Sequence, residues 1–148
     1  FEKILSLSNE RLTRLSEGRY IFVLKDESTR KFSGLDLDIL DYETGKVRDV
    51  RSLSGGESFK AALSLALGCS DMMQQLHGGL HIKTLFIDEG FGSLDAQSLD
   101  QAISVLMDIR DDDKLIGIIS HVSELKERID AQLVIKKGDL GSVIDYLP

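Results

Sequence analysis

A glycine-rich pentapeptide between a predicted strand and a predicted helix has the composition of a phosphate-binding loop. It covers residues 53–57 and reads LSGGE. Glycines let a backbone approach a ligand closely, and a helix amino terminus offers unpaired N–H groups and a positive dipole end. With the Ser54 hydroxyl as a further donor, Ser54, Gly55 and Gly56 would suit a terminal phosphate. The alternative is a structural turn in which Ser54 caps the helix and Glu57 completes a capping box.

Two carboxylates end the apolar strand predicted at residues 85–88. Asp88 closes this strand and Glu89 follows it. In parallel α/β sheets, ligands bind beyond the carboxyl ends of the strands. Asp88 could therefore hold Mg²⁺ through water, because Mg²⁺ prefers oxygen ligands and keeps several waters. Glu89 could orient or deprotonate an attacking water. The structural alternative is a strand that ends in a polar loop.

Asp95 and His121 are the remaining candidates for chemistry. Residues 90–95 read GFGSLD, which begins like a dinucleotide fingerprint, but Asp95 stands where the third glycine should be. The segment is better interpreted as a tight loop in which Asp95 caps the next helix. His121 follows the strand predicted at residues 115–119 and could donate to a γ-phosphate or to the attacking water. Taken alone, a single histidine favours a structural interpretation.

The elements that must position these residues alternate between strand and helix. The first third is predicted to be a helix followed by an antiparallel β-meander. Strands that then alternate with helices predict an α/β fold, a parallel sheet with helices packed on it. The predicted helices cover residues 1–15, 57–75, 96–110 and 123–128, and the strands cover 20–26, 35–41, 47–50, 85–88, 115–119, 131–136 and 142–146. Strand 85–88 is apolar up to its last residue, Asp88, and strand 115–119 has no polar side chain, which predicts burial on both faces. Helix 57–75 is predicted to carry one stripe, near which lie Phe59, Leu63, Ala66, Leu67 and Ser70.

Composition limits the function classes. The 148 residues are 42% hydrophobic with one proline, enough for one domain with a real core. A net charge of −7 argues against nonspecific polyanion binding by the domain as a whole. The single cysteine excludes an internal disulfide, and no apolar run approaches the length of a membrane span.

The order of these motifs resembles the carboxy-terminal half of an ABC-type ATPase. The sequence LSGGE is similar to the ABC signature and LFIDE to Walker B with its catalytic glutamate, while Ser93-Leu94-Asp95 resembles the D-loop and Ser120-His121 the switch histidine. A narrower resemblance is to the SbcC family, large subunits of the SbcCD exonucleases and DNA-repair ATPases related to the structural-maintenance-of-chromosomes (SMC) proteins. The segments RLSEGRYIFVL, LDLDILDYETGKVRDVRSLSGGESF, LFIDEGFGSLD and GIISHVSELKERI carry it.

The resemblance implies the carboxy-terminal lobe of an ABC-type P-loop ATPase head. Residues 1–17 would be the end of a coiled-coil helix and residues 18–148 the lobe. The Walker A string G-x-x-x-x-G-K-S/T does not occur in the 148 residues. The family architecture places it in the amino-terminal half of the head, so this chain alone is expected to be inactive. The face that packs on that half is expected to be apolar and exposed, which predicts self-association.

The resemblance also implies cofactors, partners and distinct tasks for two heads. ATP and Mg²⁺ would lie between two heads of a homodimer. The nucleotide of a head would be served by its own Asp88, Glu89, Asp95 and His121, and by Ser54, Gly55 and Gly56 of the other head. ATP-driven dimerisation would gate an SbcD-type nuclease partner acting on DNA, in the cytoplasm at the nucleoid and without a membrane.

Two other functions compete with this hypothesis. One is another ABC-class ATPase, such as a chromosome-organising or recombination protein or a transporter ATPase. Transporter ATPases fit less well, because a helical subdomain leads into their signature, whereas a coil-like helix and a β-meander precede it here. The other is a non-catalytic module at the end of a coiled coil, for which this order of motifs has no use.

Overall fold

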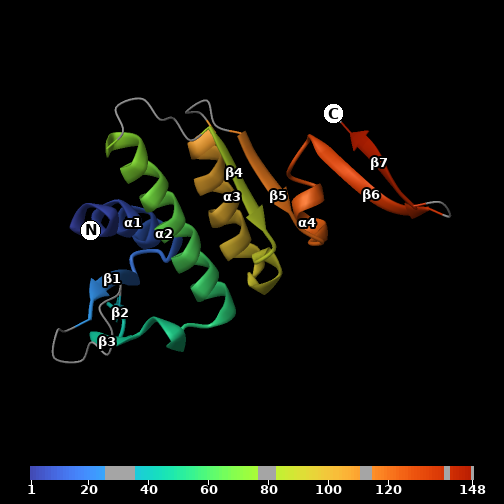
Figure 1. Cartoon of the computed structure of the whole chain (residues 1–148). Helices are drawn as coiled ribbons and strands as arrows, with labels where there is room; N and C mark the ends of the chain where they lie inside the picture. Colours follow the sequence, from blue (N-terminus) through green and yellow to red (C-terminus); the bar gives the residue numbers. More distant parts are fainter. Residues whose placement is uncertain (26–35, 77–82, 111–114, 139–140, 148) are drawn as a thin grey trace.

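An amino-terminal helix and an antiparallel sheet form the first third of the chain. The computed structural model describes residues 1–25, 36–76, 83–110, 115–138 and 141–147 (Figure 1). Helix α1 (Glu2–Leu15) leads into strands β1 (Tyr20–Leu24), β2 (Leu37–Asp41) and β3 (Lys46–Asp49), which pair antiparallel in the order β1-β2-β3. The predicted meander is confirmed.

Strands β1 and β2 are shorter than predicted, and β3 is displaced by one residue toward the amino terminus. Leu35 and Asp26, at the ends of two predicted strands, lie outside the described residues. Strand β3 ends at Asp49 rather than Val50, because the Asp49 carboxylate accepts a hydrogen bond from the backbone N–H of Arg51. This contact begins the short 3-10 turn η2 (Val50–Ser52), which leads the chain toward the glycine-rich loop.

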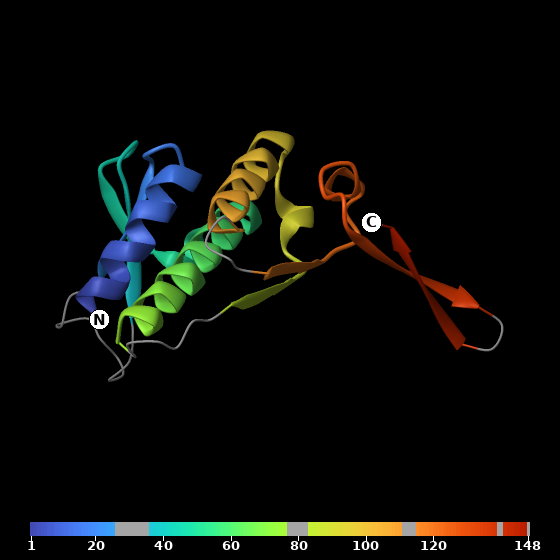
Figure 2. The same ribbon diagram turned by 90° about the horizontal axis from the view of Figure 1, so that it is seen from above.

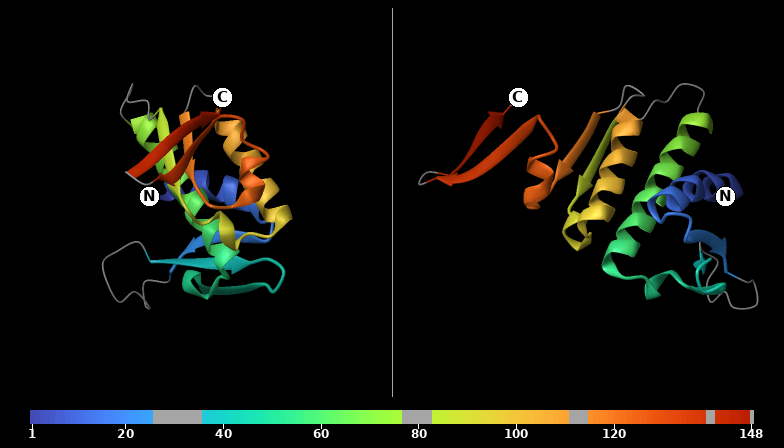
Figure 3. Two further views of the ribbon diagram at one scale, coloured as in Figure 1. Left: turned by 90° about the vertical axis from the view of Figure 1, so that its right-hand side faces the viewer. Right: turned by 180° about the vertical axis from the view of Figure 1, so that it is seen from behind.

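Helix α2 (Gly55–Leu76) stands between α1 and α3 (Figures 1 and 3). A Cβ at Gly68 would lie 2.8 Å from the backbone nitrogen of Ser8, so α1 and α2 approach more closely than a side chain would permit. Helix α2 contributes Ala61 to the core beneath α1 and the meander, and Leu63 and Leu67 to the core shared with α3. Along the predicted stripe, Leu63 and Leu67 are buried and Ala66 is exposed.

A parallel pair of strands follows, β4 (Thr84–Asp88) and β5 (Leu115–Ile119), with helix α3 (Ala96–Arg110) between them in the chain. One face of this pair packs on the core through Leu85, Ile87, Ile116 and Ile118. On the other face Phe86 is 68% exposed and Leu115 and Ile119 are also exposed. The prediction of burial on both faces is therefore wrong for the described residues, in which helices cover only one face (Figure 2).

The chain ends in a hairpin that projects from the rest of the molecule (Figures 1 and 2). Helix α4 (Ser123–Lys126) precedes β6 (Gln132–Gly138), which pairs antiparallel with β7 (Gly141–Leu147). The predicted pairing of the last two strands is confirmed, and the helix is shorter than predicted. Four apolar side chains of the hairpin that share one face are exposed: Leu133, Ile135, Ile144 and Tyr146. In the described part of the chain, no helix combines the length and apolarity needed to cross a bilayer.

Candidate functional site

The glycine-rich loop forms the start of α2, and its serine and glutamate make a capping box. The backbone N–H of Ser54 donates to Glu57 Oε2 at 2.8 Å, and the N–H of Glu57 donates to Ser54 Oγ at 3.4 Å. The structural interpretation of this loop is therefore confirmed. Ser54 is exposed, so the capping role leaves this residue accessible to a ligand.

The two glycines allow the start of α2 to pack against the loop that follows β4. A Cβ at Gly56 would lie 3.0 Å from the carbonyl oxygen of Ser93, and one at Gly55 would lie 3.3 Å from Ser93 Cβ. Ser93 ends the 3-10 turn η3 (Phe91–Ser93), whose Phe91 ring lies 4.7 Å from that of Phe59. The segment predicted to be a phosphate loop and the segment after the carboxylates thus meet directly.

Asp88, Glu89 and His121 lie at one edge of the parallel strand pair. The backbone N–H of Glu89 donates to the carbonyl of Ile119 at 2.9 Å, which extends the β4–β5 ladder beyond Asp88. Nδ1 of His121 lies 3.1 Å from Glu89 Oε2. The sequence places these residues after separate strands, and parallel pairing brings Glu89 and His121 into contact.

The backbone at Glu89 adopts a conformation that side chains rarely take. Its φ is 61°, and Gly90 follows with a φ of 96°. A left-handed conformation at a residue other than glycine costs roughly 1–3 kcal/mol and tends to occur at functional sites. At Gly90 a side chain would overlap the Phe59 ring, so glycine is required there for space as well as for conformation. The strain supports a functional role for Glu89.

Asp95 caps α3 as predicted. Its Oδ1 accepts a hydrogen bond from the backbone N–H of Ser98 at 2.8 Å, and its Oδ2 accepts one from the Ser98 hydroxyl at 3.2 Å. The hydrogen bond from the Ser98 backbone, and to a lesser extent that from the Ser98 hydroxyl, hold the pKa of Asp95 below its ordinary value. Asp95 is therefore ionised at neutral pH, and its contact with a nucleotide stays a prediction.

The candidate residues fall into two spatial groups. Ser54, Gly55, Gly56 and Asp95 line a cavity of about 440 Å³ between the start of α2, the end of α1 and the start of α3. Asp88, Glu89 and His121 lie outside this lining, at the edge of the β4–β5 pair. Within the described ranges, no three histidine, cysteine or acidic side chains gather as a metal site. An exposed carboxylate such as Asp88 can still hold Mg²⁺ through water.

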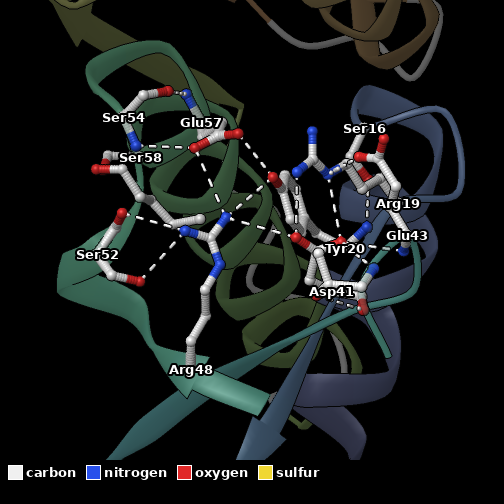
Figure 4. A network of polar contacts seen from close by, with 12 residues as sticks. Ser16, Arg19, Tyr20, Asp41, Glu43, Arg48, Ser52, Ser54, Glu57 and Ser58 are labelled. Atoms are coloured by element: carbon white, nitrogen blue, oxygen red, sulfur yellow. Dashed lines mark hydrogen bonds and ion pairs between the residues drawn. The ribbon is translucent and has the colours of Figure 1, made fainter. Parts of the chain in front are cut away.

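A polar network beside the glycine-rich loop was missed by the sequence analysis (Figure 4). The Tyr20 hydroxyl donates to Glu57 Oε1 at 2.6 Å, and Arg48 Nη2 donates to the Tyr20 hydroxyl at 3.0 Å. Behind them Asp41 is buried and accepts from Arg19 Nη2 at 3.1 Å. The charged residues of the meander indicated that it makes polar contacts. That Tyr20 contacts Glu57 becomes visible only when the meander is folded against α2.

The network changes the acidity of its members. Burial and the hydrogen bond to Glu57 raise the pKa of Tyr20 to about 12. Burial of Glu57 opposes ionisation, but hydrogen bonds from Tyr20 and Ser54 outweigh it, so the pKa of Glu57 is lowered. Hydrogen bonds from Arg19 lower the pKa of Asp41 despite its burial. At neutral pH the network thus holds neutral Tyr20 against two carboxylates and two guanidinium groups.

Comparison with known proteins agrees with the motif order. A model of the family described as "SbcC/RAD50-like, Walker B motif" matches residues 26–108. The SbcC polypeptide of the nuclease SbcCD from Vibrio cholerae is 51% identical over 145 residues, and that from Treponema pallidum is 49% identical over 142 residues. These matches cover 97% and 95% of this chain and 14% of each relative, so the chain spans about 14% of the length of the curated relatives.

Solved structures of SMC ATPase heads share the fold. A structure from work on ATP-driven dimerisation and DNA-stimulated activation of SMC ATPases aligns with a TM-score of 0.72 and 18% identity, over 99% of this chain and 84% of that one. The Smc head of Pyrococcus furiosus with an extended coiled coil, bound to the C-terminal domain of ScpA, aligns with a TM-score of 0.70 and 20% identity, over 99% of this chain and 35% of that one. The expected α/β fold of an ATPase head is confirmed.

Proposed function

This chain belongs to the SbcC/RAD50-like family, and from that premise we propose that it is part of an ATP-hydrolysing head in a DNA double-strand-break repair exonuclease. Residues 18–148 are the carboxy-terminal lobe of that head, and residues 1–17 are the end of its coiled-coil helix. The observation that carries the proposal is the contact of His121 with Glu89 at the carboxyl edge of a parallel strand pair. Ligands of parallel α/β sheets bind at this edge.

Each residue of this edge has a role in hydrolysis of the head's own nucleotide. Asp88 holds, through water, the Mg²⁺ that neutralises phosphate charge when it is bound. Glu89 orients the attacking water and accepts its proton. His121 contacts Glu89 through Nδ1 and donates to the γ-phosphate or to the water. Asp95 lines the cavity with Ser54 rather than this edge, and the family resemblance assigns it to the same nucleotide.

Ser54, Gly55 and Gly56 serve the nucleotide of a second head. Two observations support this assignment. Ser54 is exposed at the amino terminus of a 22-residue helix, where N–H groups attract phosphate. In addition, these residues line a cavity to which Asp88, Glu89 and His121 do not contribute. The two groups of residues on one head are brought to shared nucleotides when two heads associate about a two-fold axis.

The open face of the β4–β5 pair is where the amino-terminal half of the same head packs. Phe86, Leu115 and Ile119 form an exposed apolar row on strands whose other face packs on the core. Purely apolar parallel strands are ordinarily covered on both faces. The half that covers them would carry the Walker A loop, because this chain has no such string.

The partners follow from the proposed complex. Head association driven by ATP gates an SbcD-type nuclease partner, and DNA ends are its substrate. The relatives named as part of the nuclease SbcCD support this choice of partner. DNA would bind other parts of the complex more readily than this lobe, because the net charge of −7 on the lobe repels phosphate.

Mixing two inactive variants of the full-length protein tests the division between heads. A head with Ser54→Ala keeps Glu89, and a head with Glu89→Gln keeps Ser54. If Ser54 acts on the other head's nucleotide, a mixed dimer contains one intact site, and mixing restores part of the ATP turnover that each variant lacks. If both residues act on the same nucleotide, the mixture stays inactive, and the proposed arrangement fails.

A further inference from the structure

We propose that Tyr20 and Arg48 of the β-meander are positioning residues that hold Glu57, and through it Ser54, in the geometry required by the other head's nucleotide. This inference rests on the proposed function, in which Ser54, Gly55 and Gly56 (the Ser54 half-site) bind the nucleotide of the other head. It adds that residues outside the glycine-rich loop set the geometry of this half-site. On this inference, residues of the meander fix the conformation of the glycine-rich loop.

The first link is the carboxylate of Glu57, which joins two separate elements. Its Oε1 accepts the hydrogen bond from the Tyr20 hydroxyl at 2.6 Å, and its Oε2 accepts the hydrogen bond from the Ser54 backbone at 2.8 Å. Tyr20 begins β1, and Ser54 immediately precedes α2. Each oxygen therefore has its own partner, and a rotation of the Glu57 side chain would break both contacts.

The second link is Arg48, which ties the same hydroxyl to the chain just before the loop. Its Nη2 donates to the Tyr20 hydroxyl at 3.0 Å, while its Nη1 donates to the carbonyl of Ser52 at 3.2 Å. Because Arg48 only donates, the Tyr20 hydroxyl accepts from it and is left to donate to Glu57. The direction of the hydrogen bonds from Arg48 to Tyr20 to Glu57 is thereby determined (Figure 4).

Burial makes this arrangement stiff. Tyr20 is only 4% exposed, and Asp41 lies behind it at 2% exposed, with an oxygen 3.8 Å from Arg48 Nη2. Hydrogen bonds to a charged acceptor are stronger than neutral ones, and they strengthen further where water is excluded. Ser54, in contrast, is exposed, and its hydroxyl accepts only the longer bond of 3.4 Å from the Glu57 backbone. The orientation of Ser54 therefore depends on the half-buried carboxylate of Glu57.

Loss of the Tyr20 hydroxyl is expected to change binding by the Ser54 half-site more than the chemistry at Glu89. With one oxygen released, Glu57 can adopt other rotamers, and the nucleotide must then order the loop when it binds. If only a fraction of the molecules has the loop in the binding-competent conformation, the apparent affinity for the nucleotide falls in proportion to that fraction. Glu89 and His121 have no contact with this network among the described residues.

The experiment is an ATP titration of turnover and of head association in the full-length protein. For Tyr20→Phe we expect the half-saturating ATP concentration to rise by roughly threefold to tenfold, the change that corresponds to the net contribution of one ordinary hydrogen bond. Maximal turnover should stay near that of the wild type. Tyr42→Phe is the matched control, because Tyr42 lies in the same meander and its exposed hydroxyl makes no hydrogen bond with the described residues.

A second substitution keeps the test decisive if Tyr20→Phe fails to fold. Arg48→Lys retains the charge but cannot bridge Ser52 and the Tyr20 hydroxyl with a planar fork. It should raise half-saturating ATP in the same way. In addition, the effect of Tyr20→Phe should shrink when Glu57 is already changed to Gln, because the two residues act through one contact.

The outcomes separate this inference from the function on which it rests. If Ser54→Ala raises the half-saturating ATP concentration for head association while Tyr20→Phe and Arg48→Lys do not, the positioning role is wrong and the assignment of Ser54 stands. A loss of maximal turnover with unchanged half-saturating ATP also overturns it, since that result indicates general damage. If Ser54→Ala itself leaves the titration unchanged, the proposed function of the loop is wrong.

Discussion

Nδ1 of His121 lies 3.1 Å from Oε2 of Glu89, although the two residues follow different strands. The parallel pairing of Asp88 with Ile119 places both residues just beyond the same edge. The side chains are 80% and 52% exposed, so the contact adds little to stability. Together with the left-handed backbone at Glu89, this favours a role in chemistry.

Glu89→Gln in the full-length protein should allow ATP-driven head association but reduce ATP turnover by at least about a hundredfold, the usual effect of losing a general base. The amide keeps the shape of the side chain and cannot accept a proton. Glu124→Gln makes the same change at an exposed position on α4 and should leave turnover unchanged. Near-normal turnover by Glu89→Gln would remove Glu89 from its proposed role.

The hydroxyl of Tyr20 should make the stability of the fold sensitive to alkaline pH. Burial and the hydrogen bond to Glu57 raise its pKa from 10.0 to about 12. Because the folded state holds this proton more tightly, the stabilisation is complete below pH 10.0 and is lost as the pH rises toward 12. In denaturant unfolding over this window, Tyr20→Phe should therefore lose stability less steeply than the wild type.

Tyr42→Phe is the control for this pH dependence, because it removes a hydroxyl that is exposed in the same meander. It should retain the steeper slope of the wild type. Equal slopes for the wild type and Tyr20→Phe would show that the Tyr20 proton is not held by the fold.

Gly68→Ala should lower the free energy of unfolding by about 1–3 kcal/mol, the range for overpacking a tight contact. An added Cβ would lie 2.8 Å from the Ser8 nitrogen, so α1 and α2 would have to separate. Without that contact the same change would stabilise α2 by up to about 1 kcal/mol, since alanine is the better helix former. Denaturant unfolding that gave stabilisation would contradict the close approach of the two helices.

The exposed position Ala66 on α2 provides a comparison for the glycine change. Ala66→Ser alters a side chain on the same helix where space is available. It should change stability by no more than about 0.5 kcal/mol, as expected at an exposed helical position.

The isolated 148-residue chain should show no measurable ATPase activity and should self-associate. Phe86, Leu115 and Ile119 expose an apolar row, and such patches promote association. Phe86→Lys should shift the chain toward the monomer in light scattering. Tyr42→Lys places the same charge on an exposed aromatic residue of the meander and should leave association unchanged. A strictly monomeric wild-type chain, or robust turnover by the pure chain, would contradict this description.

Most of the local structure follows from the order of residues alone. The alternation of apolar and acidic residues over 35–39 predicted the strand that becomes β2, and the strand predicted at residues 47–50 corresponds to β3, which pairs with it. The position of Asp95 predicted the cap of α3. These features could be predicted because strand alternation, turns and helix caps depend on neighbouring residues, whose types are visible along the chain.

Tertiary folding determines which distant groups meet and which faces are covered. The apolar runs of β4 and β5 predicted burial on both faces, yet Phe86 is exposed, because burial depends on the elements that pack on a strand rather than on its own composition. Likewise, nothing near Tyr20 in the sequence indicates Glu57, which lies 37 residues away. That contact exists only because the meander folds against the start of α2. The motif residues could therefore be found from the sequence, whereas the residues proposed to position them became visible only in the folded chain.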